Sequence, residues 1–229
     1  MLRLILIKSL VVNLLIFMLA GLSVCAEPLI VGVNETIGEG MPKKVERIKA
    51  ALKDADLNFD FREYPWERGF QLLAQGDIAL NLYLQPRDEI EFIGLLQVRP
   101  AVDVLKFWLI THVSTAQLCN IKKNEFSEYM VVGVRGAHFF SDYVYPNFLA
   151  YEEVRHFSQM LNMVADQRVD FGLWPKDSIE TGLGGHSMDV HICESQPYLT
   201  LKFYTYLHKD FSWALPAIKK AYEKHFIVN

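Results

Sequence analysis

The side chain best placed for chemistry in this sequence is the guanidinium of Arg87, which follows an apolar segment. The segment Ile78–Leu84 has the continuous apolar character of a strand covered on both faces, and a proline-containing turn ends it. Ligands of open α/β sheets bind outside the carboxyl ends of the strands, so Arg87 is a candidate contact for an anion. The alternative is a surface ion pair with Asp88 or Glu91.

Four aromatic residues stand near predicted strand ends or helix starts, namely Tyr64, Trp66, Tyr83 and Trp174. Aromatic faces bind flat apolar groups and cations, so these residues are candidate ligand contacts. The competing interpretation is that each packs beneath the ligand site.

A further candidate is the turn at Gly136, where the N–H groups of Ala137 and His138 would open a predicted helix. A helix N-terminus can hold an anion with its free N–H groups. The alternative is a tight turn between strand and helix with no ligand.

Signatures of enzymes and metal sites are scarce. The sequence has no serine nucleophile elbow, no phosphate-binding loop and no His-Glu-x-x-His motif. The group His186, His191 and Cys193 is close in sequence, but its spacing matches no standard zinc site. We expect a binding protein with no metal and no cofactor.

The first 26 residues have the features of a secretory signal peptide. Arg3 and Lys8 precede the apolar segment Leu10–Leu22, and small residues lead up to a cleavage site after Ala26. An uncleaved anchor is the alternative, but the apolar segment is shorter than the ~20 residues that span a bilayer. We expect a periplasmic protein whose mature chain begins near Glu27.

The net charge argues against one class of partner, and the cysteine content suggests a disulfide. The whole chain carries a net charge of -4, and loss of a basic leader makes the mature chain more acidic, which disfavours nucleic acid as a partner. Cys119 and Cys193 remain after the leader. In an oxidising compartment an even pair is a plausible disulfide, and the alternative is two separate buried thiols.

Periodic apolar patterns predict an α/β chain. The predicted strands are Leu29–Val33, Leu57–Glu63, Ile78–Leu84, Val102–His112, Met130–Val134, Val169–Trp174, Asp189–Cys193 and Leu199–Leu207. The predicted helices are Lys43–Ala55, a helix from Pro65 to Gly76, one opening at Ala137, His156–Gln167, and a closing helix capped by Ser212. Ile37–Gly40 is predicted as a loop over the ligand, and 112–129 as loop or short helix. Each half has a helix, a strand and then Pro-Arg or Pro-Lys, which suggests two similar lobes.

Three motifs together resemble the bacterial extracellular solute-binding proteins of family 3. The first is the Pro-Trp-x-Arg, apolar helix and Gly-Asp-Ile pattern over Pro65–Ile78, and the second is the signature that ends at Arg87. The third is the Val-Gly-Val-x-Gly strand and turn over 132–136. The resemblance implies an α/β, two-lobed periplasmic-binding-protein-like (type II) fold, in which each lobe is a mixed sheet flanked by helices. It also implies lobe 1 at 27–107, lobe 2 at 108–194, and a return to lobe 1 at 195–229.

The resemblance implies that the protein captures a small polar or anionic molecule between its lobes, for ABC-type uptake or for sensing. Its partners would be that ligand and an ABC permease or a membrane sensor, with the protein a monomer. The arginine that matches Arg87 grips the ligand's carboxylate in the family. However, Leu82, Leu84 and Ala137 replace hydroxyl residues of the amino-acid site, and Pro175 stands at or beside the place of the usual aspartate.

Two other functions remain open. A few relatives of this fold catalyse eliminations from small molecules, and Glu35 or Glu63 would be the base of such a lyase or dehydratase. The other alternative is a sensory or structural protein that has lost its ligand.

Overall fold

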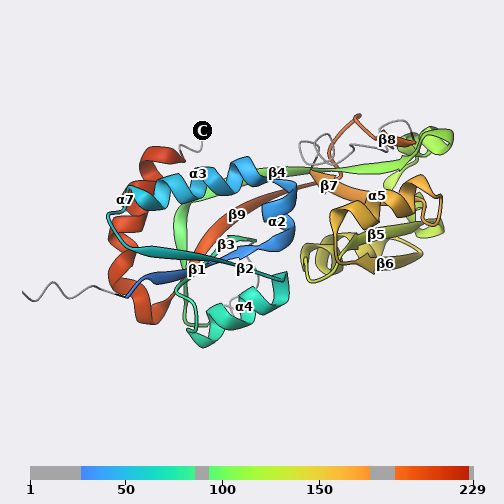
Figure 1. Cartoon of the computed structure of the whole chain (residues 1–229). Coiled ribbons are helices and arrows are strands. Elements are labelled where there is room, and N and C mark those ends of the chain that lie inside the picture. Colours follow the sequence, from blue (N-terminus) through green and yellow to red (C-terminus); the bar gives the residue numbers. More distant parts are fainter. Residues whose placement is uncertain (1–26, 86–92, 176–188, 227–229) are drawn as a thin grey trace, which may run out of the picture.

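The computed structural model describes residues 27–85, 93–175 and 189–226, which form two lobes joined by long strands (Figure 1). The α-helices are α2 (Glu35–Gly40), α3 (Pro42–Lys53), α4 (Trp66–Gln75), α5 (Phe157–Ala165) and α7 (Leu215–His225). The strands are β1 (Leu29–Asn34), β2 (Phe59–Tyr64), β3 (Leu80–Leu84), β4 (Leu95–His112), β5 (Met130–Val134), β6 (Ala150–Val154), β7 (Phe171–Pro175), β8 (Val190–Ile192) and β9 (Leu199–His208). Short 3₁₀ and π turns complete the description: η1 (Val113–Asn120), η2 (Lys123–Glu128), η3 (Phe140–Val144), η4 (Tyr145–Asn147) and η5 (Lys209–Ala214).

The described strands form a single sheet in the order β2-β1-β3-β9-β4-β7-β5-β6, with β8 paired to β4. In lobe 1, β1 runs parallel to β2 and to β3. In lobe 2, β5 runs parallel to β6 and to β7 in the same arrangement. The repeated unit predicted from the sequence is therefore confirmed, and in each lobe a helix, α4 or α5, precedes the third parallel strand.

The strand β4 passes from one lobe to the other. It pairs with β9 as far as Phe107, which lies opposite Leu199, and from Phe107 onward it pairs with β7. The sequence predicts a strand over Val102–His112, and the structure has a longer strand of 18 residues that begins at Leu95, with a register shift between Val98 and Asp103. A cis peptide bond between Arg99 and Pro100 lies inside the shifted part.

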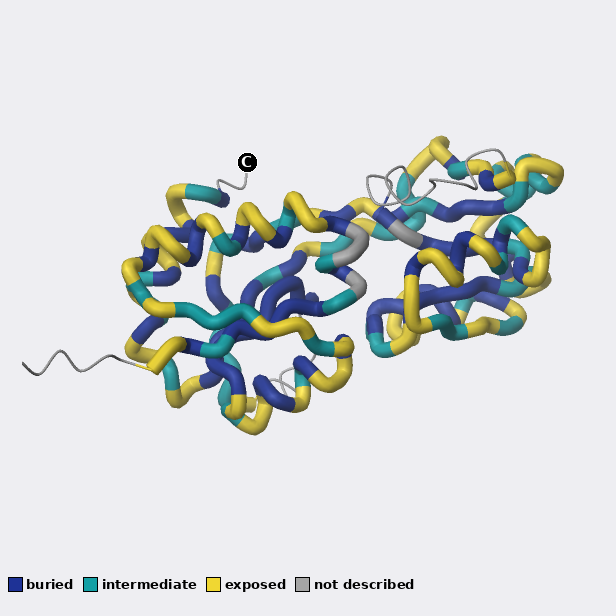
Figure 2. Tube along the Cα trace, viewed as in Figure 1, coloured by how far each residue is buried: buried dark blue, intermediate teal, exposed yellow. Residues whose placement is uncertain are grey.

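Most of the buried apolar side chains form one large cluster with members in both lobes. Figure 2 shows that each lobe contains buried segments of the chain. The apolar faces predicted for two helices contribute to it: Val45, Ile48 and Leu52 of α3, and Phe157, Met160, Leu161 and Val164 of α5. Burial of such a helix face supplies most of the stability of a short helix in a protein. α4 ends as predicted at Gly76, whose φ of 81° and N–H bonds to Leu72 and Leu73 close the last turn.

Two predictions of local structure were wrong, and one strand was missed. The segment predicted as a loop at Ile37–Gly40 belongs to α2, because Asn34 caps that helix by accepting the N–H of Ile37 at 3.0 Å. Ser212 does not cap the closing helix, since α7 begins at Leu215 with Pro216 in its first turn. The strand β6 was not predicted, because its sequence Ala-Tyr-Glu-Glu-Val has little apolar character.

Cys119 and Cys193 form a disulfide, with their Cα atoms 5.1 Å apart. The bond fastens η1 to the chain that follows β8, so it lies within lobe 2. Among the described residues, all helices are too short or too polar to cross a membrane.

Candidate functional site

The turn that ends β5 in lobe 2 rests on the start of α4 in lobe 1. Gly136 has a φ of 79°, a left-handed conformation that glycine adopts without strain. A Cβ atom built on Gly136 would lie 3.3 Å from the Cβ of Trp66 and 3.5 Å from the backbone nitrogen of Glu67. The lobes therefore touch at this point, and the absence of a side chain on Gly136 permits the close approach.

Two of the predicted aromatic contacts, Tyr64 and Trp66, line one small hollow in lobe 1. Asn34, Leu82 and Leu84 line it too, so it lies at the carboxyl ends of β1 and β3. The empty space around it is about 200 Å³ when the open solvent at its mouth is included. The hollow itself is too narrow to admit a water molecule. Trp66 is 8% exposed. The aromatic side chains thus fill the place where ligands bind in open α/β sheets.

Asn34 has a buried amide group with one atom unpaired. Its side chain is 7% exposed, and its oxygen caps α2. The Nδ2 atom is buried and makes no hydrogen bond with any residue that the structure describes. A buried donor without a partner costs about 1–3 kcal/mol, so this atom favours an acceptor that is not part of the described chain.

Gln85, which follows β3, has a buried amide oxygen, Oε1, that accepts no hydrogen bond from the described residues. The residue is 5% exposed, and its Nε2 donates across the lobes to Oδ2 of Asp142 at 3.5 Å, which is the long limit of a hydrogen bond. An unpaired donor and an unpaired acceptor therefore lie at the carboxyl ends of β1 and β3, which are neighbouring parallel strands.

Tyr83, another predicted ligand contact, is buried in lobe 1. Its hydroxyl donates to Oδ2 of Asp103 at 3.0 Å, and the same carboxylate oxygen lies 2.8 Å from Nζ of Lys44. Burial and then the Asp103 charge raise the pKa of Tyr83 above its ordinary value. The φ of Tyr83 is 61°, which is an uncommon conformation for a residue with a side chain. The structure thus gives Tyr83 a polar contact with the crossing strand β4.

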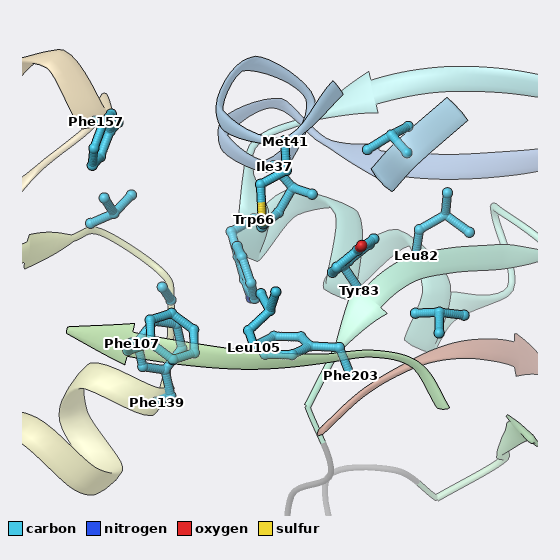
Figure 3. Close-up of a cluster of buried hydrophobic side chains, with 14 of the residues drawn as sticks. Ile37, Met41, Trp66, Leu82, Tyr83, Leu105, Phe107, Phe139, Phe157 and Phe203 are labelled. Atoms are coloured by element: carbon cyan, nitrogen blue, oxygen red, sulfur yellow. The ribbon is translucent and has the colours of Figure 1, made fainter. Parts of the chain in front are cut away.

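Aromatic rings connect Tyr83 to lobe 2 along the crossing strands. The rings of Tyr83 and Phe203 are 5.9 Å apart, those of Phe203 and Phe107 are 6.2 Å apart, and those of Phe107 and Phe139 are 4.6 Å apart. Figure 3 shows Phe107 and Leu105 on β4 between Trp66 of lobe 1 and Phe139 of lobe 2. The region where the lobes join is therefore apolar and well packed.

The helix predicted after Gly136 is short. Ala137 is buried, His138 is half-buried, and the turn continues into the π-helix η3 of five residues. So short a segment has a small dipole, and it adds little to an anion site. A role for Gly136 and His138 in binding stays a prediction.

The structure says little about the two remaining predicted ligand contacts, Arg87 and Trp174. Arg87 lies outside the described residues, and so do Asp88 and Glu91. Trp174 belongs to β7, where its backbone pairs with Trp108, but its side chain lies outside the description.

The two carboxylates considered as catalytic bases lie on different elements of lobe 1. Glu35 is the first residue of α2, and Glu63 is exposed on the edge strand β2. Within the part of the chain that the structure describes, no three His, Cys, Asp or Glu side chains are grouped as a metal site.

The sequence interpretation missed Asn34, Gln85 and Asp142. Asn34 carries a signal that was available, because asparagine at a strand end is a preferred helix N-cap. Gln85 and Asp142 meet only through the approach of the two lobes, and neither residue stands in a recognisable motif.

No protein-family model matches the chain, and no curated protein sequence matches it. Solved structures do match in fold. The ligand-binding core of GluR0 in complex with L-glutamate has a TM-score of 0.73 and 13% identity, over 87% of this chain and 92% of that one. A histidine kinase sensor domain with similarity to periplasmic binding proteins has a TM-score of 0.70 and 9% identity, over 86% of this chain and 90% of that one.

A third similar structure is the amino acid ABC transporter substrate-binding protein AbpA from Streptococcus pneumoniae, bound to L-arginine. It has a TM-score of 0.65 and 13% identity, over 86% of this chain and 88% of that one. These similarities confirm the two-lobed periplasmic-binding-protein-like fold expected from the sequence.

Proposed function

We propose that this protein binds a small polar molecule between its two lobes, in the periplasm, and supplies it to an ABC permease or reports it to a membrane sensor. The observation that supports this most is the pair of buried, unpaired amide atoms, Nδ2 of Asn34 and Oε1 of Gln85. They lie at the carboxyl ends of adjacent parallel strands, at the edge where this architecture binds ligands.

The two atoms indicate the chemistry of the ligand. A group that accepts a hydrogen bond from Asn34 and another that donates to Gln85 would each remove a cost of about 1–3 kcal/mol. Arg87, two residues after Gln85, would add a bidentate contact to an anionic acceptor. Tyr64 and Trp66 would contact a flat or apolar part of the ligand. The proposed ligand is therefore a small molecule with donor and acceptor groups on an apolar body.

Ordinary amino acids fit this site poorly. Leu82 is 1% exposed and Ala137 is 3% exposed, and neither offers the hydroxyl group that holds an amino acid's carboxylate in the resembling family. Two or three missing hydrogen bonds would weaken binding by several orders of magnitude. We expect calorimetry to find no micromolar binding of standard amino acids.

Binding would require the lobes to separate and close again, because Gly136 of lobe 2 rests on Trp66 and Glu67 of lobe 1, beside the proposed ligand site. Strand β4 would supply the bend, at Phe107, where its pairing changes from β9 to β7. Hinge closure around a ligand is a common movement of two-lobed proteins.

A thermal-shift screen of polar metabolites tests the proposal. A ligand present at 100 times its Kd adds about 2.7 kcal/mol to the free energy of unfolding, which a melting curve resolves. A screen that yields no stabilising compound would favour the alternative of a sensory or structural protein that has lost its ligand. Turnover of a stabilising compound would favour the lyase or dehydratase, with Glu35 and Glu63 as the first residues to replace.

A further inference from the structure

A second pocket lies in lobe 2, where the edge of β4 passes from β8 to β9. The N–H of Cys193 donates to the carbonyl of Leu109 at 2.9 Å, and the N–H of Tyr198 donates to the carbonyl of Phe107 at 2.8 Å. Between these two bonds the chain leaves the ladder, and Ser195, Gln196 and Pro197, together with Cys193 and Tyr198, make one wall of the pocket. The rest of the lining comes from Leu109 and from residues 119–126, so no residue of 27–85 takes part.

The base of this pocket is apolar and held rigidly. Leu109 and Phe126 are buried, and the Cys119–Cys193 disulfide fastens the two sides together. The ring of Tyr198 forms a side wall, and it meets the edge of Phe126 with their centroids 5.6 Å apart. Walls that are already ordered lose little freedom when a ligand binds.

The size of the pocket suits one ring. Its free volume is about 520 Å³ including the open mouth, of which about 120 Å³ admits water-sized molecules. An apolar cavity of about 150 Å³ binds benzene, so the space matches a single six-membered ring and a small substituent.

A cation stands at the mouth of the pocket. Nζ of Lys123 lies 5.7 Å from the centroid of the Tyr198 ring, where the negative face of the ring attracts it. Ser195 and Gln196 are exposed and add hydrogen-bonding groups to the rim. We propose that this pocket binds a single-ring aromatic carboxylate, with its ring on Leu109 and Tyr198 and its carboxylate near Lys123. This site is separate from the one between the lobes and does not depend on the proposed function.

Titration of the purified protein with para-fluorobenzoate, followed by fluorine NMR, tests the proposal. We expect a saturable shift of the probe, and shifts of the backbone amide signals of Leu109, Phe126 and Gln196. Lys123→Gln should weaken binding about two- to fivefold, as for other exposed charge pairs. Lys122→Gln is the matched control, because Lys122 is exposed beside Lys123 but does not line the pocket, and it should leave binding unchanged.

Two further measurements locate the probe. Ser195→Trp places a large side chain at the exposed rim and should abolish binding. Neutral para-fluorobenzamide should bind the native protein more weakly than the benzoate, and the two should bind Lys123→Gln equally. The proposal is overturned if the benzoate gives no saturable shift at millimolar concentrations, or if its binding survives Ser195→Trp with no shift at Leu109. Loss of binding in Arg87→Ala with Ser195→Trp unaffected would place the probe between the lobes, which overturns this site while supporting the proposed function.

Discussion

The oxygen and the nitrogen of the Asn34 amide lie in different surroundings, so mutation can test them separately. Its oxygen caps α2, and its nitrogen is buried beside the hollow at Trp66 without a partner among the described residues. Serine is also a good N-cap, but it lacks the amide nitrogen.

We therefore predict that Asn34→Ser lowers affinity for an identified ligand about five- to tenfold, which corresponds to one lost hydrogen bond. The free energy of unfolding should change by only a few tenths of a kcal/mol, because the cap is retained. Asn34→Ala is the comparison, since it loses the cap and should also cost about 1 kcal/mol of stability. Calorimetry and urea denaturation measure the two effects. Equal affinity of Asn34→Ser and the native protein would show that the amide nitrogen does not touch the ligand.

Arg87 is predicted to act on binding alone. Arg87→Ala should lower ligand affinity about tenfold or more, because a charge-assisted hydrogen bond contributes roughly 1.5–3 kcal/mol. The melting temperature of the empty protein should remain nearly unchanged. If the variant melts earlier and binds as well as the native protein, Arg87 is structural and the ligand lies elsewhere.

At the scale of helices and strands, the sequence predicts most of what local patterns control. Gly76 ends α4 and the apolar spacing marks α5, because both signals lie within a few residues of the element they define. The strand β6 escaped prediction because its residues are mostly polar, and its pairing with β5 comes from tertiary structure. The contacts of Gly136 with Trp66, and of Gln85 with Asp142, join residues more than 50 positions apart, so no local pattern contains them.

The contact of Gly136 with α4 leads to a prediction about closure. Gly136→Leu should hold the lobes apart, because its side chain would meet Trp66 and the backbone of Glu67. Gly94→Leu is the matched control: Gly94 has a φ of 83°, and the described atoms nearest to its missing side chain belong to the flexible side chain of Lys209. Both variants place a leucine at a backbone position with a left-handed conformation, which should lower the stability of each by roughly 1–2 kcal/mol. Small-angle X-ray scattering should therefore show a larger radius of gyration for Gly136→Leu alone. Equal radii for both variants and the native protein would contradict the prediction.

The protein as a whole should lose stability in alkaline solution. Burial raises the pKa of Tyr83, Tyr145 and Tyr222 above the ordinary value of 10.0, and it raises the pKa of Tyr198 to about 12. The folded protein therefore keeps phenolic protons that the unfolded chain releases near pH 10. Their stabilising contribution is complete below pH 10 and is lost as the pH rises through the folded pKa values.

We expect the free energy of unfolding to fall between about pH 10 and pH 12, as measured by urea denaturation. Lysines titrate in the same range, so Tyr222→Phe is the necessary comparison. This variant loses the hydrogen bond between Tyr222 and Thr205, but its stability should fall less steeply with pH. The same slope in both proteins would contradict the role given to Tyr222.

The redox state is a further property of the whole molecule. Intact-mass measurement of secreted material should show a chain that starts near Glu27 and takes up no alkyl group before reduction, because Cys119 and Cys193 are bonded. Replacing both cysteines with serine should cost up to about 4 kcal/mol, since the disulfide closes a long loop. Retention of the leader, or two alkyl groups added without reduction, would contradict this prediction.

The position of β9 in the sheet also determines the order in which the lobes can be completed as the secreted chain folds. β9 lies between β3 and β4, yet it is the last described strand of the chain to emerge during secretion. β9 follows the parallel strands of lobe 2 and both disulfide-bonded cysteines in the chain (Figure 1). Lobe 2 can therefore form as a unit before the sheet of lobe 1 is complete. Until residues 199–208 arrive, β3 has no partner on one edge, and the nascent first lobe exposes a row of unpaired backbone groups. A chaperone that shields such an edge would therefore engage the part of the protein that is made first.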